Sequence, residues 1–382
     1  MTTAYRRPSD AHALAHNFRV FADADCTSEP LYAALSHAIA NDDAILELLM
    51  QAPYRQRRPV LLFAAVHDLL LGGITHRLAA FYRSLTADAH HDPEVERAHA
   101  AFADFCAVHR DALLAIITTR GTQTNETGRA AGLALALLGL LASRPIALID
   151  VGCSAGLNLF VDRYRFEYRS ADHAAQTIGP AGASVVVPCL LEGDTTPWHE
   201  EAGTALPAIS ARVGIDLAPL DVRREDDARW LSACVWPSDT TRGERLKRAL
   251  GEAQRDPPRL VAGDADTALP RVLDDLDFGL RPVVFHSWVL SYFDHAARVR
   301  FSERMFDLVA TRNAIWISAE SASVVPGLVT PALGPDASPA RREATLWHMT
   351  SRGDDGKASS RVLARSHPHC TWIEWLATNT TA

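Results

Sequence analysis

The chain has 382 residues, which is long enough for roughly two to three domains, and it is 48% hydrophobic and 22% charged. This composition excludes a disulfide-stapled peptide, a disordered chain and a fibrous repeat. The net charge of −8 argues against a surface that attracts nucleic acid or anionic lipid, so we expect neither partner.

The first 143 residues have helical periodicity throughout. Apolar residues recur at helical spacing, as at Leu31, Leu35 and Ile39. Pro59 begins a long apolar stretch, and Gly72 ends it. The pattern predicts an all-helical N-terminal domain over residues 1–143.

The sequence pattern changes after Arg144 and Pro145, where short β-type runs alternate with helical stretches. This alternation predicts a second domain over residues 144–382, with an α/β fold in which a mostly parallel sheet is doubly wound. Residues 170–211 are richer in Gly, Pro and Thr, so we expect an insertion there. Residues 345–350 and 361–365 flank a turn and are expected to form an edge hairpin. The other expected strands cover 146–151, 185–187, 259–262, 283–285 and 315–317.

The segment richest in chemical information is IALIDVGCSAGLN, residues 146–158. It predicts a buried strand, a turn of small residues and then a helix whose N-terminus favours an anionic group. Two enzyme classes use such a pattern. With Asp150, Gly152, Ser154 and Gly156 as D-x-G-x-S-x-G, it resembles motif I of class I S-adenosylmethionine-dependent methyltransferases. As G-x-S-x-G alone, it is a nucleophile elbow, with Ser154 as the nucleophile of a hydrolase.

Three features favour the adenosyl cofactor over the hydrolase. Asp150 suits a sulfonium or ammonium group, but it would repel the oxyanion of acyl transfer. No His-Gly-Gly segment that could supply an oxyanion loop precedes the motif. Two further acids, Asp216 and Asp264, follow strand-like segments in order, as in a nucleoside site that uses carboxylates for the ribose and beside the base.

A wider set of segments resembles a bacterial family of uncharacterised proteins whose core is similar to class I methyltransferases. The segments are DVGCSAGLNLFVDRYRFEY at 150–168, TQTNE at 122–126, VFHS at 284–287 and HPH at 367–369. The resemblance covers nearly the whole chain. It implies a Rossmann-like fold and S-adenosyl-L-methionine as the cofactor, but it names no acceptor. Asp216 lies farther along the chain than a ribose-binding acid usually does, so Glu167 and Asp172 remain alternatives for that role.

Several polar residues outside the loop are candidates for chemistry or for substrate binding. His286 follows a predicted central strand, and an imidazole with its ordinary pKa near 6.5 suits a general base. A structural role is the alternative for His286 and for each candidate substrate-binding residue, which are Gln123, Asn125, Glu126, Arg129 and Tyr292. We expect no metal site, because His367 and His369 alone are too few ligands.

The sequence therefore predicts a methyltransferase that acts on an unknown acceptor, for which a small molecule is favoured over a macromolecule. The loop from Asp150 to Gly156 would hold the amino-acid end of S-adenosyl-L-methionine, Asp216 the ribose, and Asp264 with Ala265 the adenine. The alternatives are a serine hydrolase, in which Ser154 works with Asp264 and with His286 or His367, and a non-catalytic cofactor-binding protein.

The expected cellular location rests on the spacing of the cysteines and on the length of the apolar runs. The six cysteines are scattered without a C-x-x-C pair, as in a reducing compartment. The N-terminal segment has no uninterrupted apolar region, and the apolar run 130–142 is shorter than the roughly 20 residues that span a bilayer. We expect a cytoplasmic protein without a signal peptide or a membrane contact. The oligomeric state is not predicted by these patterns.

Overall fold

The computed structural model describes residues 5–86, 95–138, 140, 144–171, 174–193, 205–333 and 338–376. The chain divides into two compact units, of which the first contains Met1–Thr124 with Arg223–Lys247 and the second contains Asn125–Val222 with Arg248–Ala382. This division differs from the expected single boundary at residue 143. A later segment, residues 223–247, belongs with the N-terminal helices, and residues 125–143 belong with the sheet.

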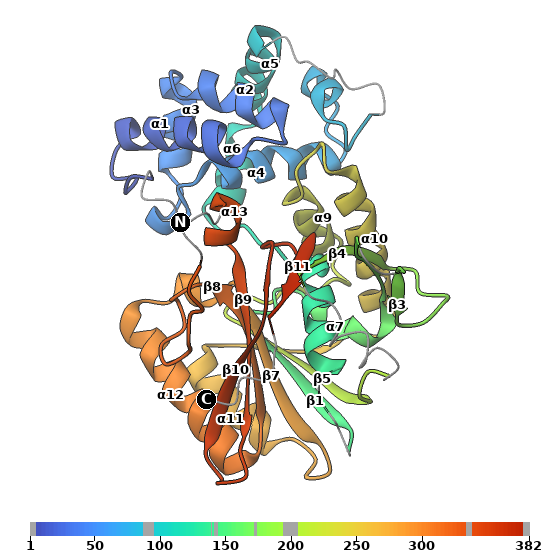
Figure 1. The fold of residues 1–382 in the computed structure, drawn as a ribbon. Coiled ribbons are helices and arrows are strands. Elements are labelled where there is room, and N and C mark those ends of the chain that lie inside the picture. Colours follow the sequence, from blue (N-terminus) through green and yellow to red (C-terminus); the bar gives the residue numbers. More distant parts are fainter. Residues whose placement is uncertain are drawn as a thin grey trace. The chain divides into compact units, whose positions relative to one another are not determined.

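The regular elements in the described part of the first unit are helical (Figure 1). Aspartates cap two of the helices, since Asp10 accepts a hydrogen bond from Ala13 N and Asp42 accepts one from Ile45 N. The α-helices are α1 (Ala11–Val20), α2 (Pro30–Ile39), α3 (Asp43–Met50), α4 (Pro59–Leu71), α5 (Val95–Val108), α6 (Arg110–Ile117), α9 (Glu225–Ala233) and the first half of α10 (Thr240–Arg255). The short helices are η1 (Phe21–Asp25), η2 (Tyr54–Gln56) and η3 (Arg77–Phe81).

Helix α9 belongs to this unit because it satisfies two buried polar residues of α4. His67 Nδ1 donates to Ala233 O (3.1 Å), and Arg229 Nε donates to Asp68 Oδ1 (3.1 Å). Burial lowers the pKa of His67 to about 4, so the imidazole is neutral at physiological pH. A sequence pattern shows two such polar residues inside an apolar helix, but it does not show which distant segment pairs with them.

The second unit is built on an eleven-stranded mixed sheet, in which most of the strand pairings are parallel. The strand order is β3-β2-β4-β11-β10-β9-β8-β7-β1-β5-β6. The strands from β8 to β6 in this order are parallel to one another, and β9 joins β8 antiparallel. The strands are β1 (Ile146–Val151), β2 (Arg165–Arg169), β3 (Gln176–Ile178), β4 (Val186–Glu192), β5 (Ile209–Asp216), β6 (Arg259–Ala262), β7 (Arg281–Ser287), β8 (Ile315–Ser321), β9 (Thr345–Arg352), β10 (Ala358–Ser366) and β11 (Trp372–Trp375).

Two expectations about the sheet are corrected by its topology. Residues 176–192, expected within an insertion, contribute strands β3 and β4 to the sheet itself. The β9–β10 hairpin forms as expected, but it is internal, because β11 pairs with the free side of β10 and then with β4. The strand β11 is only four residues long and shows little alternation, so its sequence does not reveal it.

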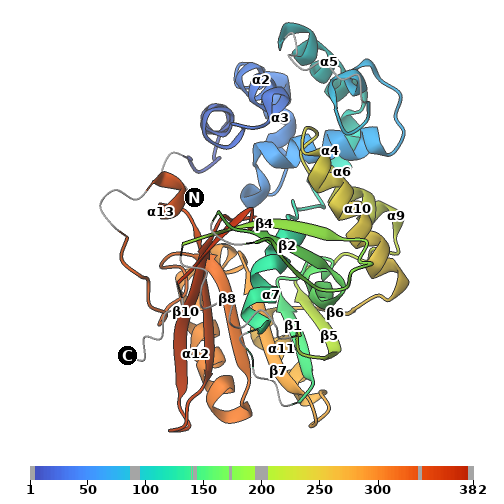
Figure 2. The same cartoon turned by 45° about the vertical axis from the view of Figure 1, so that its right-hand side comes forward.

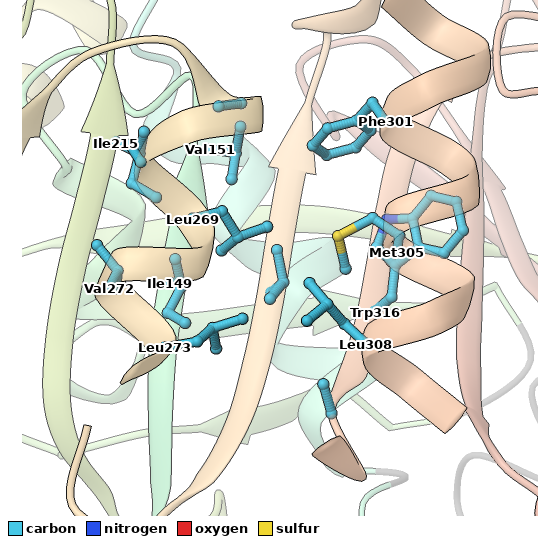
Figure 3. Close-up of a cluster of buried hydrophobic side chains, with 14 of the residues drawn as sticks. Ile149, Val151, Ile215, Leu269, Val272, Leu273, Phe301, Met305, Leu308 and Trp316 are labelled. Atoms are coloured by element: carbon cyan, nitrogen blue, oxygen red, sulfur yellow. The ribbon is translucent and has the colours of Figure 1, made fainter. Parts of the chain in front are cut away.

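Helices cover both faces of the parallel part of the sheet (Figure 2). Helices α11 (Ala265–Asp274) and α12 (His295–Arg312) lie on one face, where Leu269 and Met305 pack with Val151 of β1 (Figure 3). Helix α7 (Ala130–Leu138) lies on the other face, where Gly132 lies directly against the Trp347 ring and Ala131 O accepts a hydrogen bond from the Tyr168 hydroxyl. The short helices of this unit are η4 (Thr127–Arg129), η5 (Leu157–Arg163) and η6 (Leu290–Tyr292), and α13 (Pro339–Arg342) precedes β9.

Within the part of the chain that the structure describes, no helix is both long enough and apolar enough to cross a membrane.

Candidate functional site

The loop that follows β1 is a tight bend made of small residues. Gly152, Ser154 and Gly156 all have left-handed backbone conformations, with φ values of 76°, 55° and 71°. Such values favour glycine, because a side chain at positive φ is strained. Gly152 is also needed for packing, since a β-carbon placed there would lie 2.4 Å from Val289 Cγ2. The bend therefore has a fixed shape and lies at the carboxyl end of a strand that is buried throughout.

Asp216 at the end of β5 holds this loop. Its Oδ2 accepts a hydrogen bond from Ser154 N (2.8 Å), and its Oδ1 accepts one from Ala218 N (2.9 Å). Its backbone oxygen accepts a hydrogen bond from Gly263 N (2.9 Å), next to Asp264 at the end of β6. The loop, Asp216 and Asp264 thus occupy neighbouring carboxyl ends of parallel strands, which is the arrangement that the sequence predicts.

Asp150 is a buried acid beneath the loop. Its side chain points away from the face of Val151, toward the side covered by α7, and the residue is 4% exposed. Burial raises the pKa of Asp150 and the nearby charge of Asp216 raises it further, whereas Arg129 lowers it. The surroundings therefore do not fully compensate an ionised carboxylate, which would gain from a cationic or hydrogen-bond-donating ligand.

The other acids considered for the ribose have different surroundings. Glu167 lies on β2, forms ion pairs with Arg165 (3.3 Å) and Arg169 (3.7 Å), and is separated from β1 by several strands in the sheet order. Asp172 lies outside the described residues. Of the two candidates that the structure describes, Asp216 is the acid that it brings to the loop.

Asp264 and Ala265 begin helix α11 beside this edge. The carboxylate of Asp264 is exposed and accepts a hydrogen bond from Asp266 N (2.9 Å), so it caps the helix. Ala265 is buried against the sheet. A capping aspartate keeps further lone pairs for a ligand, so the cap is compatible with a binding role.

His286 has a different environment from the one expected. It is fully buried at the end of β7, on the face covered by α12, where its ring contacts Phe301. Trp316 Nε1 donates to His286 Nε2 (2.9 Å), and the opposite ring nitrogen, Nδ1, lies 2.9 Å from Glu320 Oε1. Because indole N–H is only a donor, Nε2 is an acceptor and Nδ1 carries the proton. Neither nitrogen is left to take a proton from a substrate, so this geometry favours a structural role.

The expected substrate-binding residues have different surroundings. Glu126 Oε1 accepts a hydrogen bond from Gly128 N (2.7 Å), which caps η4 beside Asn125. Arg129 is buried, and it donates to Pro368 O (2.9 Å) and to Ser287 O (3.5 Å), so it links η4, β7 and the segment after β10. Gln123 belongs to the first unit. Tyr292 in η6 is 58% exposed.

Sequence reasoning missed two residues that support the loop. Val289 packs against Gly152, and Glu320 anchors the segment that carries Val289. His367, which the sequence offers as a histidine for the hydrolase alternative, is half-buried near Glu126; burial lowers its pKa while the Glu126 charge raises it. Glu320 carried a detectable signal, because it follows the apolar run of β8 as Asp150 and Asp216 follow theirs.

The structure gives Ser154 no catalytic partner. Its Oγ is buried and has no hydrogen-bond partner among the described residues, so no described imidazole is placed to activate it. This geometry does not favour the serine hydrolase. In the described ranges, no three His, Cys, Asp or Glu side chains gather closely enough to hold a metal ion.

Comparison with known proteins identifies the family but not the reaction. Residues 15–375 match a family described as an uncharacterised protein conserved in bacteria, DUF2332, and the chain belongs to that family. No curated protein matches the chain in sequence. The chemistry must therefore be inferred from the site itself.

Proposed function

We propose that this DUF2332 protein is an S-adenosylmethionine-dependent methyltransferase whose sheet unit has a Rossmann-like fold. The observation that carries the proposal is the hydrogen bond from Ser154 N to Asp216 (2.8 Å). It joins a loop of small residues at the end of β1 to the acid at the end of β5. A nucleoside site needs this combination of a close-approach loop and a neighbouring ribose acid.

The strand order supports a cofactor at this edge. In the order β6-β5-β1-β7-β8, β1 is central. The strands β5 and β6, which follow it in the chain, lie on one side, and the later strands β7 and β8 lie on the other. This is the order of the doubly wound dinucleotide-binding sheet, in which ligands bind at the carboxyl ends of the strands where the order reverses. Here the reversal lies between β1 and β7, and the Gly152–Gly156 loop begins there.

The residues present fit the chemical groups of S-adenosyl-L-methionine. Asp150 is a buried carboxylate that a ligand ammonium would stabilise. The buried Ser154 hydroxyl has no partner among the described residues, so it is available to a polar group. Each oxygen of Asp216 accepts one backbone hydrogen bond and keeps a lone pair for a ribose hydroxyl, while exposed Asp264 is available beside the adenine. Bound there, the cofactor would supply an electrophilic methyl group on a sulfonium.

The contribution of the chain is positioning. The loop, Asp150 and Asp216 would fix the orientation of the cofactor, and the buried edge around them would exclude water from the transfer. His286 is not used as a base, because both of its ring nitrogens are occupied. Arg129, whose charge acts on Asp150, and Glu126, which caps the short helix that carries Arg129, are the candidates for binding the acceptor.

A small-molecule acceptor and a cytoplasmic location complete the proposal. The net charge of −8 gives no general attraction to nucleic acid. All six cysteines are free thiols, and five of them are buried, which is compatible with a reducing compartment.

Titration calorimetry with S-adenosyl-L-methionine tests the proposal. We expect the wild type to bind, and we expect Asp264→Asn to weaken binding about tenfold, as for loss of one hydrogen bond to a charged group. Asp277→Asn is the matched control. Asp277 is also exposed and accepts a backbone hydrogen bond two residues on, from Gly279 N, but it precedes β7 and so lies toward the amino end of the strands. No binding by pure wild-type protein at about millimolar cofactor refutes the proposal.

A further inference from the structure

One buried carboxylate oxygen holds the segment that follows β7. Glu320, near the end of β8, is 1% exposed. Its Oε1 accepts hydrogen bonds from Val289 N (2.9 Å) and Leu290 N (3.1 Å), in addition to the bond from His286 Nδ1 (2.9 Å). Three donors from one short segment, residues 286–290, therefore converge on a single oxygen of β8.

The histidine is held so that it can only donate to this oxygen. His286 pairs with Ser318 of β8, and Trp316 lies two residues before Ser318 on that strand. The indole N–H of Trp316 donates to His286 Nε2. The proton of the neutral imidazole is therefore on Nδ1, facing Glu320. His286 and Trp316 thus orient the carboxylate, which is a positioning function and not proton transfer.

The segment that Glu320 anchors has a strained backbone. Trp288 has a φ of 57°, which is rare for a large side chain and strains the backbone. Its amide donates to Ala319 O (3.0 Å), and its indole donates to Thr345 Oγ1 (2.8 Å). A turn of this kind persists only where the surroundings fix it, and Glu320 fixes the two residues that follow.

Val289 transmits this restraint to the loop after β1. Its side chain occupies the space beside Gly152, 2.4 Å from where a β-carbon would lie. Movement of residues 288–290 would therefore remove the support from one side of the Gly152–Gly156 bend. Glu320 acts on the bend through this segment, since its hydrogen bonds within the described residues go to His286, Val289 and Leu290.

We propose that Glu320 is a positioning residue of the cofactor site, which acts by holding Val289 against the Gly152 loop. This inference rests on the proposed function, because it assigns Glu320 a role in binding S-adenosyl-L-methionine. It also has a consequence without any ligand. The amides of Val289 and Leu290 should exchange with solvent as slowly as amides of the central strands, although they lie outside a strand.

Three variants test the inference through amide exchange of the ligand-free protein and affinity for S-adenosyl-L-methionine. Glu320→Ala removes the acceptor, and we expect exchange at Val289 and Leu290 to accelerate and affinity to fall, each about tenfold or more. Glu320→Gln keeps an acceptor oxygen in place and should stay within about threefold of the wild type in both measurements. Val289→Ala leaves the anchor intact and removes the methyl groups that fill the space beside Gly152 and pack against the hydrophobic core, so it should weaken affinity without accelerating exchange.

The outcomes separate this inference from the proposed function. If the wild type binds no cofactor, the proposed function fails and this inference fails with it. If the wild type binds and Glu320→Ala leaves either exchange or affinity unchanged, the inference alone is overturned. Should Glu320→Ala not fold, Val289→Ala decides, because unchanged affinity in that variant overturns the inference and weakened affinity supports it.

Discussion

Replacing Gly152 with alanine probes the packing on which the candidate site depends. Two costs add at this position. A side chain at a φ of 76° costs about 1–2 kcal/mol, and the collision with Val289 Cγ2 at 2.4 Å forces a shift of the kind that costs about 1–3 kcal/mol. We expect Gly152→Ala to lose about 2–5 kcal/mol of unfolding free energy.

Gly356 is the matched control for the conformational cost alone. It has a φ of 80° in the β9–β10 turn, and a β-carbon there would come no closer than 3.5 Å to another group, the Arg352 guanidinium. Gly356→Ala should therefore lose only about 1–2 kcal/mol. Adding Val289→Ala to Gly152→Ala removes the contact with Cγ2 at 2.4 Å and leaves the contact with the β-carbon of residue 289 at 2.7 Å, so the collision is reduced. The double variant should therefore be less destabilised than the sum of the two single variants.

Equilibrium unfolding in urea, followed by tryptophan fluorescence, measures these differences. A pair of equal losses for Gly152→Ala and Gly356→Ala would show that Val289 does not fill the space beside Gly152. Strict additivity of Gly152→Ala and Val289→Ala would refute the reasoning in the same way, because the two residues would then not be in contact.

Three further predictions concern single residues. Burial lowers the pKa of His67 in the folded state to about 4, below its value near 6.5 in the unfolded chain. Between pH 7 and pH 5 the wild type should therefore lose about 2 kcal/mol of unfolding free energy, and His67→Gln should not. Urea unfolding at each pH measures this difference. Burial raises the pKa of Asp150, so the free energy of unfolding falls as the pH rises above the pKa of this group in the unfolded chain. Asp150→Asn should therefore melt at a higher temperature than the wild type at pH 7 without ligand, yet bind S-adenosyl-L-methionine more weakly. A lower melting temperature contradicts this reasoning. A fluorophosphonate probe should not label the wild type at Ser154, because its hydroxyl has no described base; labelling that Ser154→Ala abolishes would restore the hydrolase.

The sequence predicts strands of the parallel part of the sheet well, because they read as short apolar runs, whether the strand is buried throughout, as β1 is, or lies at the edge, as β6 does. The segments 146–151 and 259–262 coincide with β1 and β6, and the turn with small residues after β1 is where it was expected. The acid at the end of β5 was likewise identified from a local pattern, a strand followed by a carboxylate. Local periodicity is sufficient for such features.

Long-range pairings were not predictable from local pattern. The strand β11 pairs with β10 and with β4, and β4 lies far earlier in the chain. The segment 223–247 packs with helices more than a hundred residues before it. His286 was placed at the correct strand end, but its orientation depends on Trp316 and Glu320, which lie on another strand. Hydrogen-bond partners of a buried polar residue are set by tertiary packing, which a single sequence does not display.

A crystal structure of the protein with S-adenosyl-L-homocysteine tests the central claim most directly. We predict that the ligand lies over the loop from Gly152 to Gly156, with its ribose hydroxyls bonded to Asp216 and its ammonium nearest Asp150. Ligand bound elsewhere, or an absence of ligand at saturating concentration, would contradict the assignment of this strand edge as an adenosyl site.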